Sequence, residues 1–294
     1  MEFVVSYLLV SVIITTKNEQ VNIQNCLESI PTSLHPSSFI LPPFSVEIIV
    51  VDNNSIDKTV EIAKKYTDKV CNFGPERSAQ RNFGVKKANG KYILYLDADM
   101  ILSENVIFEC IEKCEKEGCF ALYIPERIIG EGFWVKIRDL ERSFYNATVI
   151  DCVRFVRRDK FLEIGGFDES LTGPEDWDFD RRIKEIGEVD IVNAPIYHNE
   201  GEFNLKRYIN KKSYYTKTFD KYINKWGKND KIIRKQLGFC YRYFGVFMED
   251  GKWKRLLRHP ILSGGMYGLR ILVGIRYLLR IRKSQDNIVK NNRE

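Results

Sequence analysis

The stretch YILYLDADM, residues 92–100, decides the fold class of this chain. Its apolar and aromatic residues are typical of a buried strand, and that strand ends in two carboxylates, Asp97 and Asp99. Acids at i and i+2 lie on one side of a strand or share the turn just beyond it. Their repulsion raises at least one pKa unless a cation neutralises the pair, and the ions Mg²⁺ and Mn²⁺, which prefer oxygen ligands, suit that task. A solvated loop or a helix cap is the alternative interpretation.

Strand-like and helical patterns alternate along the residues that precede this stretch. The predicted strands are 11–16, 46–52 and 91–99, and the predicted helices are 19–30, 55–66 and 78–88. Ser55 is the expected cap of the second helix. The alternation predicts an α/β fold with a mainly parallel central sheet flanked by helices. Ligands of such sheets bind at the carboxyl ends of the strands, where Asp52, Asp97 and Asp99 fall.

Composition limits the class of protein. With 294 residues, 44% hydrophobic and 29% charged, the chain is long enough for one large globular domain plus an extension. The seven cysteines are odd in number and include no CxxC pair, which predicts reduced thiols inside a cell. Cys110, Cys114 and Cys119 match zinc-ligand spacings poorly. The apolar run at 3–16 is shorter than the roughly 20 residues of a membrane-spanning helix, so it predicts a buried first strand.

Charge divides the chain into two parts. Residues 1–200 hold 23 Lys and Arg against 33 Asp and Glu, whereas residues 201–294 hold 23 against 7. We therefore expect a catalytic or binding domain at 8–205 and a basic, mainly helical C-terminal region at 206–294. The basic region suits an anionic partner such as a membrane surface, a nucleic acid or phosphate groups, but it contains no recognisable nucleic-acid module.

The apolar segment 261–279 is the strongest candidate for contact with a membrane. Arg270 and Arg276 interrupt it, and burying them in a bilayer costs roughly 2.5–3.5 kcal/mol each. The pattern favours a helix that lies in the membrane interface with its arginines on the wet face. A helix that simply packs on the first domain fits the same pattern.

Four stretches, in this order, carry a resemblance to a known family: SVIITTKNE (11–19), VEIIVVDNNSIDKT (46–59), ERSAQRNFGVKKANGKYILYLDADM (76–100) and FVRRDKFLEIGGFDESLTGPEDWDFDRRIKEIG (155–187). Over residues 10–200 the chain resembles the family 2 glycosyltransferases, inverting enzymes of the GT-A fold that use nucleotide sugars. The resemblance implies a Rossmann-like GT-A domain followed by the basic helical extension. It also implies Mg²⁺ or Mn²⁺ as cofactor and a nucleotide sugar as donor.

The resemblance also implies which residues bind the donor. Thr16 and Glu19 lie near the base and ribose, Asp52 binds the nucleobase, Arg77 and Arg81 lie beneath the diphosphate and base, Asp97 is the acid on the ribose side, and Asp99 coordinates the metal with Asp97 beside it. Guanidinium groups bind phosphate in a bidentate manner, so the residue types fit. A structural explanation exists for each: Glu19 complements a helix dipole, Asp52 satisfies a turn, and the arginines lie on a solvated helix face.

The motif GPEDWDFDRRI, residues 173–183, supplies the carboxylates that the transfer requires. An acceptor hydroxyl loses its proton as it attacks, so a base is needed across the cleft from the metal. The resemblance implies that Asp176 is this base and that Glu175 contacts the acceptor. Stabilisation of a helix dipole is the alternative role for both. His198 follows a predicted strand, and some relatives use a histidine there as a metal or diphosphate ligand; a structural histidine is the alternative.

Acceptor binding is predicted for Trp134 and Arg138, which lie between the two acidic motifs where relatives contact acceptors. The apolar stripe around them is otherwise typical of core packing. The QxxRW motif of processive relatives is absent, which favours transfer of one sugar per acceptor. We therefore expect a transferase acting on a glycan or lipid-linked acceptor at the cytoplasmic face of a membrane. The alternatives are a sugar nucleotidyltransferase and a nucleotide-sugar-binding protein without activity.

Overall fold

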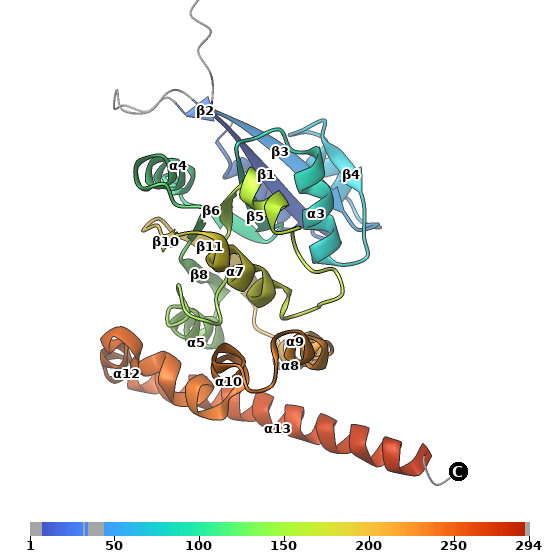
Figure 1. The fold of residues 1–294 in the computed structure, drawn as a ribbon, viewed down its shortest axis with the longest axis vertical. Helices are drawn as coiled ribbons and strands as arrows, with labels where there is room; N and C mark the ends of the chain where they lie inside the picture. Colours follow the sequence, from blue (N-terminus) through green and yellow to red (C-terminus); the bar gives the residue numbers. More distant parts are fainter. Residues whose placement is uncertain (1–7, 32, 35–43, 292–294) are drawn as a thin grey trace, which may run out of the picture.

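The structure is a computed structural model that describes residues 8–31, 33–34 and 44–291 (Figure 1). Its centre is a parallel trio of strands, β1 (Leu8–Thr16), β3 (Phe44–Asp52) and β5 (Tyr92–Asp97), with β1 in the middle. These are the three strands that the sequence predicts. Residues 3–7 of the N-terminal apolar run lie outside the described residues.

Shorter strands extend this trio into an eight-stranded sheet. They are β2 (Ser33–Leu34), β4 (Val70–Asn72), β7 (Ala121–Tyr123), β9 (Phe155–Arg157) and β10 (Val189–Ile191). The order is β10-β7-β9-β5-β1-β3-β2, and β4 pairs with the opposite end of β3 from β2. Only β2 and β9 run antiparallel to their neighbours. The mainly parallel α/β sheet that the sequence predicts is confirmed.

Helices cover both faces of the sheet because alternate strand residues point to opposite sides. Val12 and Ile14 pack in the cluster that includes α1 (Ile23–Glu28), α2 (Thr59–Ala63) and α4 (Val106–Glu117). Ile13 packs on the other face in the cluster that includes α3 (Arg77–Lys87), α6 (Arg158–Glu163) and α7 (Glu175–Ile186). Because α2 begins only at Thr59, the prediction that Ser55 caps this helix is wrong; Ser55 instead bonds Asp52 in the turn after β3.

A second, three-stranded sheet adjoins the first. It consists of β6 (Met100–Leu102), β11 (Ile196–Glu202) and β8 (Glu126–Glu131), with β11 in the centre. The amide of Asn199 donates to the carbonyl of Asp99, so β11 runs directly past the end of the DAD motif. Helix α5 (Phe133–Arg142) follows β8 and packs against it.

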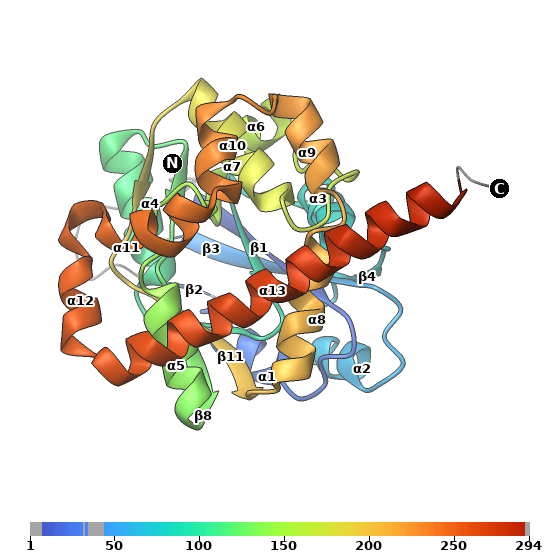
Figure 2. The same cartoon turned by 90° about the horizontal axis from the view of Figure 1, so that it is seen from below.

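The C-terminal region is helical and packs on the first part of the chain. It contains α8 (Leu205–Tyr215), α9 (Phe219–Trp226), α10 (Lys231–Leu237), the π-helix η1 (Tyr241–Gly245), α11 (Val246–Met248), the 3₁₀ turn η2 (Glu249–Gly251), α12 (Trp253–Arg258) and α13 (Pro260–Asn291). The long helix α13 runs along the side of the molecule that carries α5 and α8 (Figures 1 and 2). Ile137 and Phe144 share one apolar core with Phe247, Met266 and Leu269.

This packing corrects one expectation about α13. Arg270 is only 7% exposed, and its guanidinium donates to Glu141 of α5 at 2.7 Å, so it does not lie on a wet face. Arg276 is exposed, as expected. Within the part of the chain that the structure describes, no helix combines the length and the apolar character that a membrane crossing requires.

Candidate active site

The carboxyl ends of the central strands meet at one edge of the sheet. Thr16 lies opposite Asp52 in the β1–β3 register, and Thr15 lies opposite Asp97 in the β1–β5 register. The buried amide of Gln80 holds the first pair of strands together, since its Nε2 donates to the carbonyls of Val51 at 2.6 Å and Thr16 at 3.2 Å. The residues predicted from the strand ends are thus brought to one place.

Asp97 lies at the centre of this edge. It accepts hydrogen bonds from Thr15 Oγ1 at 3.0 Å, Arg81 Nη2 at 3.1 Å and Arg77 Nη1 at 3.4 Å. Burial by itself raises the pKa of Asp97, but the two guanidinium groups outweigh it and hold that pKa well below its usual range. Asp97 is therefore ionised at neutral pH.

The same two arginines connect Asp97 to the acidic start of α7. Arg81 Nη1 donates to Asp176 at 2.7 Å, and Arg77 Nη2 donates to Glu175 at 3.1 Å. Arg81 is 1% exposed and lies over the ring of Tyr95, 4.8 Å from its centroid, so its position is fixed. The strand end and the GPED motif, far apart in sequence, consequently face one shared site.

Glu175 and Asp176 occupy different surroundings although they are adjacent. Glu175 is 2% exposed; burial and the charge of Asp176 raise its pKa, with Arg77 opposing the shift. The side chain of Asp176 is 28% exposed. Both lie in the first turn of α7, where the helix dipole favours negative charge.

A histidine with two carboxylate partners lies beside Asp99. His198 Nε2 is 3.0 Å from Asp99 Oδ2, and Nδ1 is 3.0 Å from Glu126 Oε1. Burial lowers the pKa of His198, but Asp99 and Glu126 together raise it to about 10. A histidine whose Nδ1 is held by a carboxylate while Nε2 faces another ligand has the arrangement common to metal-binding histidines.

Three buried oxygen atoms at this edge lack a hydrogen-bond partner among the described residues: Thr16 Oγ1, Asp99 Oδ1 and Glu175 Oε2. Such atoms are uncommon in folded proteins and call for an explanation, such as an ion or ligand. Asp99 and His198 offer the oxygen and nitrogen atoms that Mn²⁺ accepts, and Mg²⁺ accepts the oxygens. The donor set therefore fits the metal that the sequence predicts.

Glu19 and Asp52 lie at the same edge with different local partners. Glu19 bonds Asn22, and burial followed by the charge of Asp99 raises its pKa, against Arg207 and Lys211 of α8. Asp52 is 2% exposed and accepts the amide of Ser55 at 2.8 Å, which is the turn role that the sequence also allows.

An open pocket of about 730 Å³ adjoins Arg77. Its other walls include Lys206, Arg207 and Lys211 from α8, so the basic C-terminal region contributes directly to the site. We call this space the donor-side pocket. The ring of Tyr215, at the end of α8, lies 5.3 Å from the Arg77 guanidinium.

The two predicted acceptor residues lie elsewhere. Arg138 is 7% exposed and is already ion-paired with Glu141 and with Glu200, the latter at 3.1 Å. Trp134 is 44% exposed and stacks on Phe203 at the mouth of an apolar groove of about 460 Å³ beside α13. Their contacts among the described residues do not include the Asp97–Asp176 cluster.

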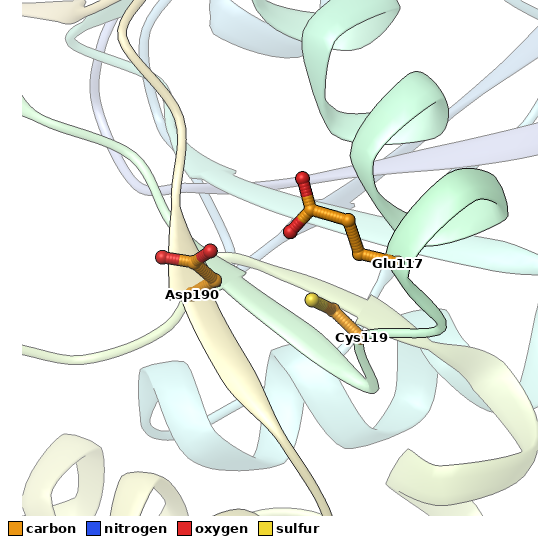
Figure 3. A group of neighbouring side chains, drawn as sticks. All are labelled: Glu117, Cys119 and Asp190. Atoms are coloured by element: carbon orange, nitrogen blue, oxygen red, sulfur yellow. The ribbon is translucent and has the colours of Figure 1, made fainter.

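A second group of possible metal ligands lies at the end of α4 (Figure 3). Glu117, Cys119 and Asp190 place one ligand atom each within 4.8 Å of the others. The ammonium group of Lys113 already lies 2.7 Å from Asp190 and 3.8 Å from Glu117. This lysine supplies the positive charge that the acids require, so the group has a structural explanation.

Sequence reasoning missed two residues that fix His198. Glu126 accepts from the histidine, and Arg154 Nη2 donates to Glu126 at 3.0 Å. The only signal in the sequence was a carboxylate that closely follows the apolar residues 120–124. Because β8 pairs with β11 over a long sequence separation, that signal could not indicate its partner.

Comparison with known proteins agrees with this geometry. Residues 11–165 match the family described as Glycosyl transferase family 2. The match covers more than half of the chain, which therefore belongs to this family and is a glycosyltransferase. The family prediction and the enzyme class are confirmed, and the match favours a transferase over a nucleotidyltransferase or an inactive binding protein.

Individual relatives are similar over most of the chain. An uncharacterized glycosyltransferase of Rickettsia typhi is 28% identical over 255 residues, covering 82% of this chain and 80% of its own length. A crystal structure of S. aureus TarS 1-349 with UDP-GlcNAc has a TM-score of 0.54 at 19% identity, covering 80% of this chain and 72% of that one. A mannosyltransferase of Pyrobaculum calidifontis, PcManGT, solved with GDP-Man and Mn²⁺, has a TM-score of 0.55 at 15% identity, covering 91% and 84%. The GT-A fold is thereby confirmed.

Proposed function

We propose that this protein is a metal-dependent, inverting glycosyltransferase that moves a single sugar from a nucleotide-sugar donor to an acceptor hydroxyl. The observation that carries the proposal is the convergence of unpartnered buried oxygens of Thr16, Asp99 and Glu175 on the edge where Arg77 and Arg81 join two acidic motifs. Two structures of the same fold were solved with nucleotide sugars, which supports a donor of this class.

Asp99 and His198 would hold the metal, with Asp97 close by. A bound Mn²⁺ or Mg²⁺ supplies positive charge where negative charge develops on the departing nucleoside diphosphate. Glu126 keeps His198 oriented, because it holds the Nδ1 side of the ring. Arg77, about one-third exposed and facing the donor-side pocket, binds phosphate oxygens. Lys206, Arg207 and Lys211 of α8 add positive charge to the same pocket.

Asp176 acts as the general base. Arg81 holds its Oδ1, and because the side chain is 28% exposed, its other oxygen is accessible to accept the acceptor's proton. Glu175, more deeply buried, binds the acceptor hydroxyl with its unpartnered Oε2. Attack from the face opposite the leaving group inverts the anomeric configuration, as a base placed across the sugar requires.

The test is release of nucleoside diphosphate from a panel of UDP- and GDP-sugars with Mn²⁺. Asp176→Asn and Asp99→Asn should each lower kcat by roughly 10²-fold or more, the scale of a lost general base or charge stabiliser. Asp190→Asn, in the Glu117 group, is the matched control and should retain parental activity. Parental rates in both site variants, or retention of the anomeric configuration by NMR, would refute the proposal.

We also propose that the acceptor is lipid-linked and that the C-terminal region brings the protein to the cytoplasmic face of a membrane. The support is an exposed set of apolar and basic residues on α12 and the start of α13. Leu257 is 71% exposed and Ile261 is 75% exposed, next to the exposed Arg255 and Arg258. Apolar side chains combined with basic charge are typical of interfacial helices.

Co-sedimentation with anionic vesicles tests this membrane contact. The parent should bind at low salt and release at high salt, because surface attraction is screened. Leu257→Glu should reduce the bound fraction by about fivefold or more, whereas Val21→Glu, an equally exposed apolar residue on the sheet domain, should not. Equal binding by parent and Leu257→Glu would rule out this surface.

A further inference from the structure

A third cavity, of about 330 Å³, lies between α7, α8 and the helices that follow α8. Its walls include Trp177, Tyr208, Lys212, Arg242, Tyr243 and Arg270, and we call it the cationic cavity. Gly173 and Trp177 line this cavity, and they flank Glu175 and Asp176 in the sequence. The cavity therefore lies at the start of α7. Tyr215 lines both this cavity and the donor-side pocket. The two spaces are therefore neighbours around the catalytic carboxylates.

The charges around the cationic cavity do not balance. Arg270 and Arg138 share Glu141, and Arg138 also takes Glu200. Two cations remain: neither Lys212 nor Arg242 forms an ion pair with any described side chain. The ammonium group of Lys212 lies 5.5 Å from the centroid of the Tyr208 ring, and the Arg242 guanidinium lies 5.8 Å from the centroid of Trp177.

Such an arrangement is unfavourable without a ligand. Burial, together with the charges of Arg138 and Arg242, lowers the pKa of Lys212 to about 7, and Glu141 only partly opposes this. Lys212 and Arg242 are half-buried. Cations withdrawn from water are normally paired, so two uncompensated cations facing a cavity indicate a missing anion. A guanidinium fork and an ammonium group together match the oxygens of a phosphate group.

We propose that the cationic cavity binds a phosphate group carried by the acceptor. This rests on the proposed function, since the cavity then orients an acceptor hydroxyl toward Asp176. The aromatic rings of Trp177, Tyr208 and Tyr243 supply the apolar walls typical of small-ligand pockets, with few polar groups fixing the orientation. The two uncompensated charges favour a phosphate over a carboxylate, which carries a single charge.

Titration with inorganic phosphate tests the cavity directly, using the full chain and thermal unfolding. Phosphate should raise the Tm of the parent, and Lys212→Met and Arg242→Gln should bind it at least tenfold more weakly. The control is Lys211→Met, because Lys211 lines the donor-side pocket and not the cationic cavity. If Lys211→Met loses the response and Lys212→Met keeps it, phosphate binds the donor side and the proposal fails.

Stability without phosphate provides a second measurement. In phosphate-free buffer Lys212→Met should be at least as stable as the parent, because an uncompensated charge has been removed. Arg242→Gln covers the case in which Lys212→Met does not fold. Acetate at equal ionic strength should protect less than phosphate, and equal protection by the two ions would overturn the assignment of a phosphate.

Activity separates this proposal from the proposed function. Hydrolysis of the donor by water needs no acceptor, so Lys212→Met should release nucleoside diphosphate at a rate within about twofold of the parental rate. Transfer to a phosphate-bearing acceptor should fall at least tenfold in the same variant. A parent without donor hydrolysis would count against the proposed function alone, since phosphate binding is still measurable. A soluble sugar phosphate and a prenyl phosphate distinguish the two sources of the group, and failure of both to bind would overturn the proposal.

Discussion

Replacing Arg81 by methionine should remove the connection between the sheet and the acidic start of α7. The Arg81 guanidinium donates to Asp97 at 3.1 Å and to Asp176 at 2.7 Å, and it lies over the rings of Tyr95 and Phe167. Methionine fills much of the same space but leaves both carboxylates without this donor. The variant therefore reports how strongly the two acidic motifs depend on one buried cation.

The magnitude follows from what each carboxylate retains. Removing one partner of a buried ion pair costs roughly 3–5 kcal/mol. Arg77 still contacts Asp97 at 3.4 Å, and the Asp176 side chain is 28% exposed and can be rehydrated. These two facts reduce the loss, while the lost cation–π contacts add to it at roughly 0.5–2 kcal/mol each. We expect the free energy of unfolding to fall by about 3 kcal/mol, near the lower end of that range.

Urea unfolding at pH 7 measures this loss. Arg157→Met is the control: its partner Asp159 is 57% exposed, so that variant should lose less than about 1 kcal/mol. The double variant with Asp176→Asn should lose less than the sum of the two single variants, by roughly 1–2 kcal/mol of coupling. A loss in Arg81→Met no larger than in Arg157→Met, or strict additivity, would refute the reasoning.

The loss should also depend on pH. Because the pKa of Asp97 is lower in the folded protein than its unfolded value of 3.8, this group stabilises the folded state at pH values above 3.8. The stabilisation is lost as the pH falls toward the pKa of the folded state. Arg81→Met removes much of this contribution. The difference between parent and variant should therefore be largest near pH 7 and shrink below about pH 4.

Three other substitutions have outcomes of defined sign. Burial raises the pKa of Asp180 from 3.8 to about 6, so the folded parent loses stability as pH rises through this window. Relative to the parent, Asp180→Asn should therefore gain about 2 kcal/mol of unfolding free energy between pH 4 and pH 7, as measured by urea unfolding. A difference that stays constant with pH would contradict this. Glu126→Gln should weaken Mn²⁺ binding by roughly 10–100-fold in calorimetric titration, since the carboxylate orients a ligand, and unchanged affinity would remove His198 from the metal site. Gly173→Ala should lower the free energy of unfolding by about 2–3 kcal/mol, because φ is +101° and a Cβ would lie 2.1 Å from the Tyr215 carbonyl oxygen. The control Gly227→Ala, with φ +93° and open space around it, should lower it by about 1 kcal/mol. Equal losses in the two variants would show that the contact with Tyr215 has no effect.

The central fold could be predicted because its signals are local. Apolar runs define β1, β3 and β5, of which β3 and β5 end in aspartates, and the alternation of strands with helices requires parallel neighbours. The short strands could not be predicted in the same way. β7, β9 and β10 have three residues each and are positioned by pairing with distant segments, which periodicity cannot reveal. The helix limits failed for a similar reason: the turn that Ser55 makes with Asp52 delays the start of α2.

The candidate site was predictable wherever a motif ends a strand or begins a helix. Asp97, Asp99, Glu175 and Asp176 are of this kind, and the structure brings them to one edge of the sheet. Their roles in the reaction remain predictions. Arg138 was different, because helical spacing indicates a face but not a partner, and the face of α5 that carries it turns toward Glu200. Residues that act through pairing across the second sheet, such as Glu126, leave no pattern in a single sequence.

The positively charged residues of the C-terminal region lie in two different places, which composition alone cannot distinguish. Lys212, Arg242 and Arg270 face inward and line the cationic cavity, whereas Arg255 and Arg258 are exposed beside apolar residues. Only the exposed cations can attract a membrane, because the charge of a cation that faces the interior is neutralised by internal carboxylates or by a bound anion. The two proposals therefore assign different cations to different ligands. Neutralising Arg255 and Arg258 should weaken vesicle binding without altering phosphate binding. Neutralising Lys212 should weaken phosphate binding without altering vesicle binding. If the Arg255 and Arg258 substitutions or the Lys212 substitution changed both measurements equally, the inward and outward cations would belong to one surface, and the division argued from burial would be wrong.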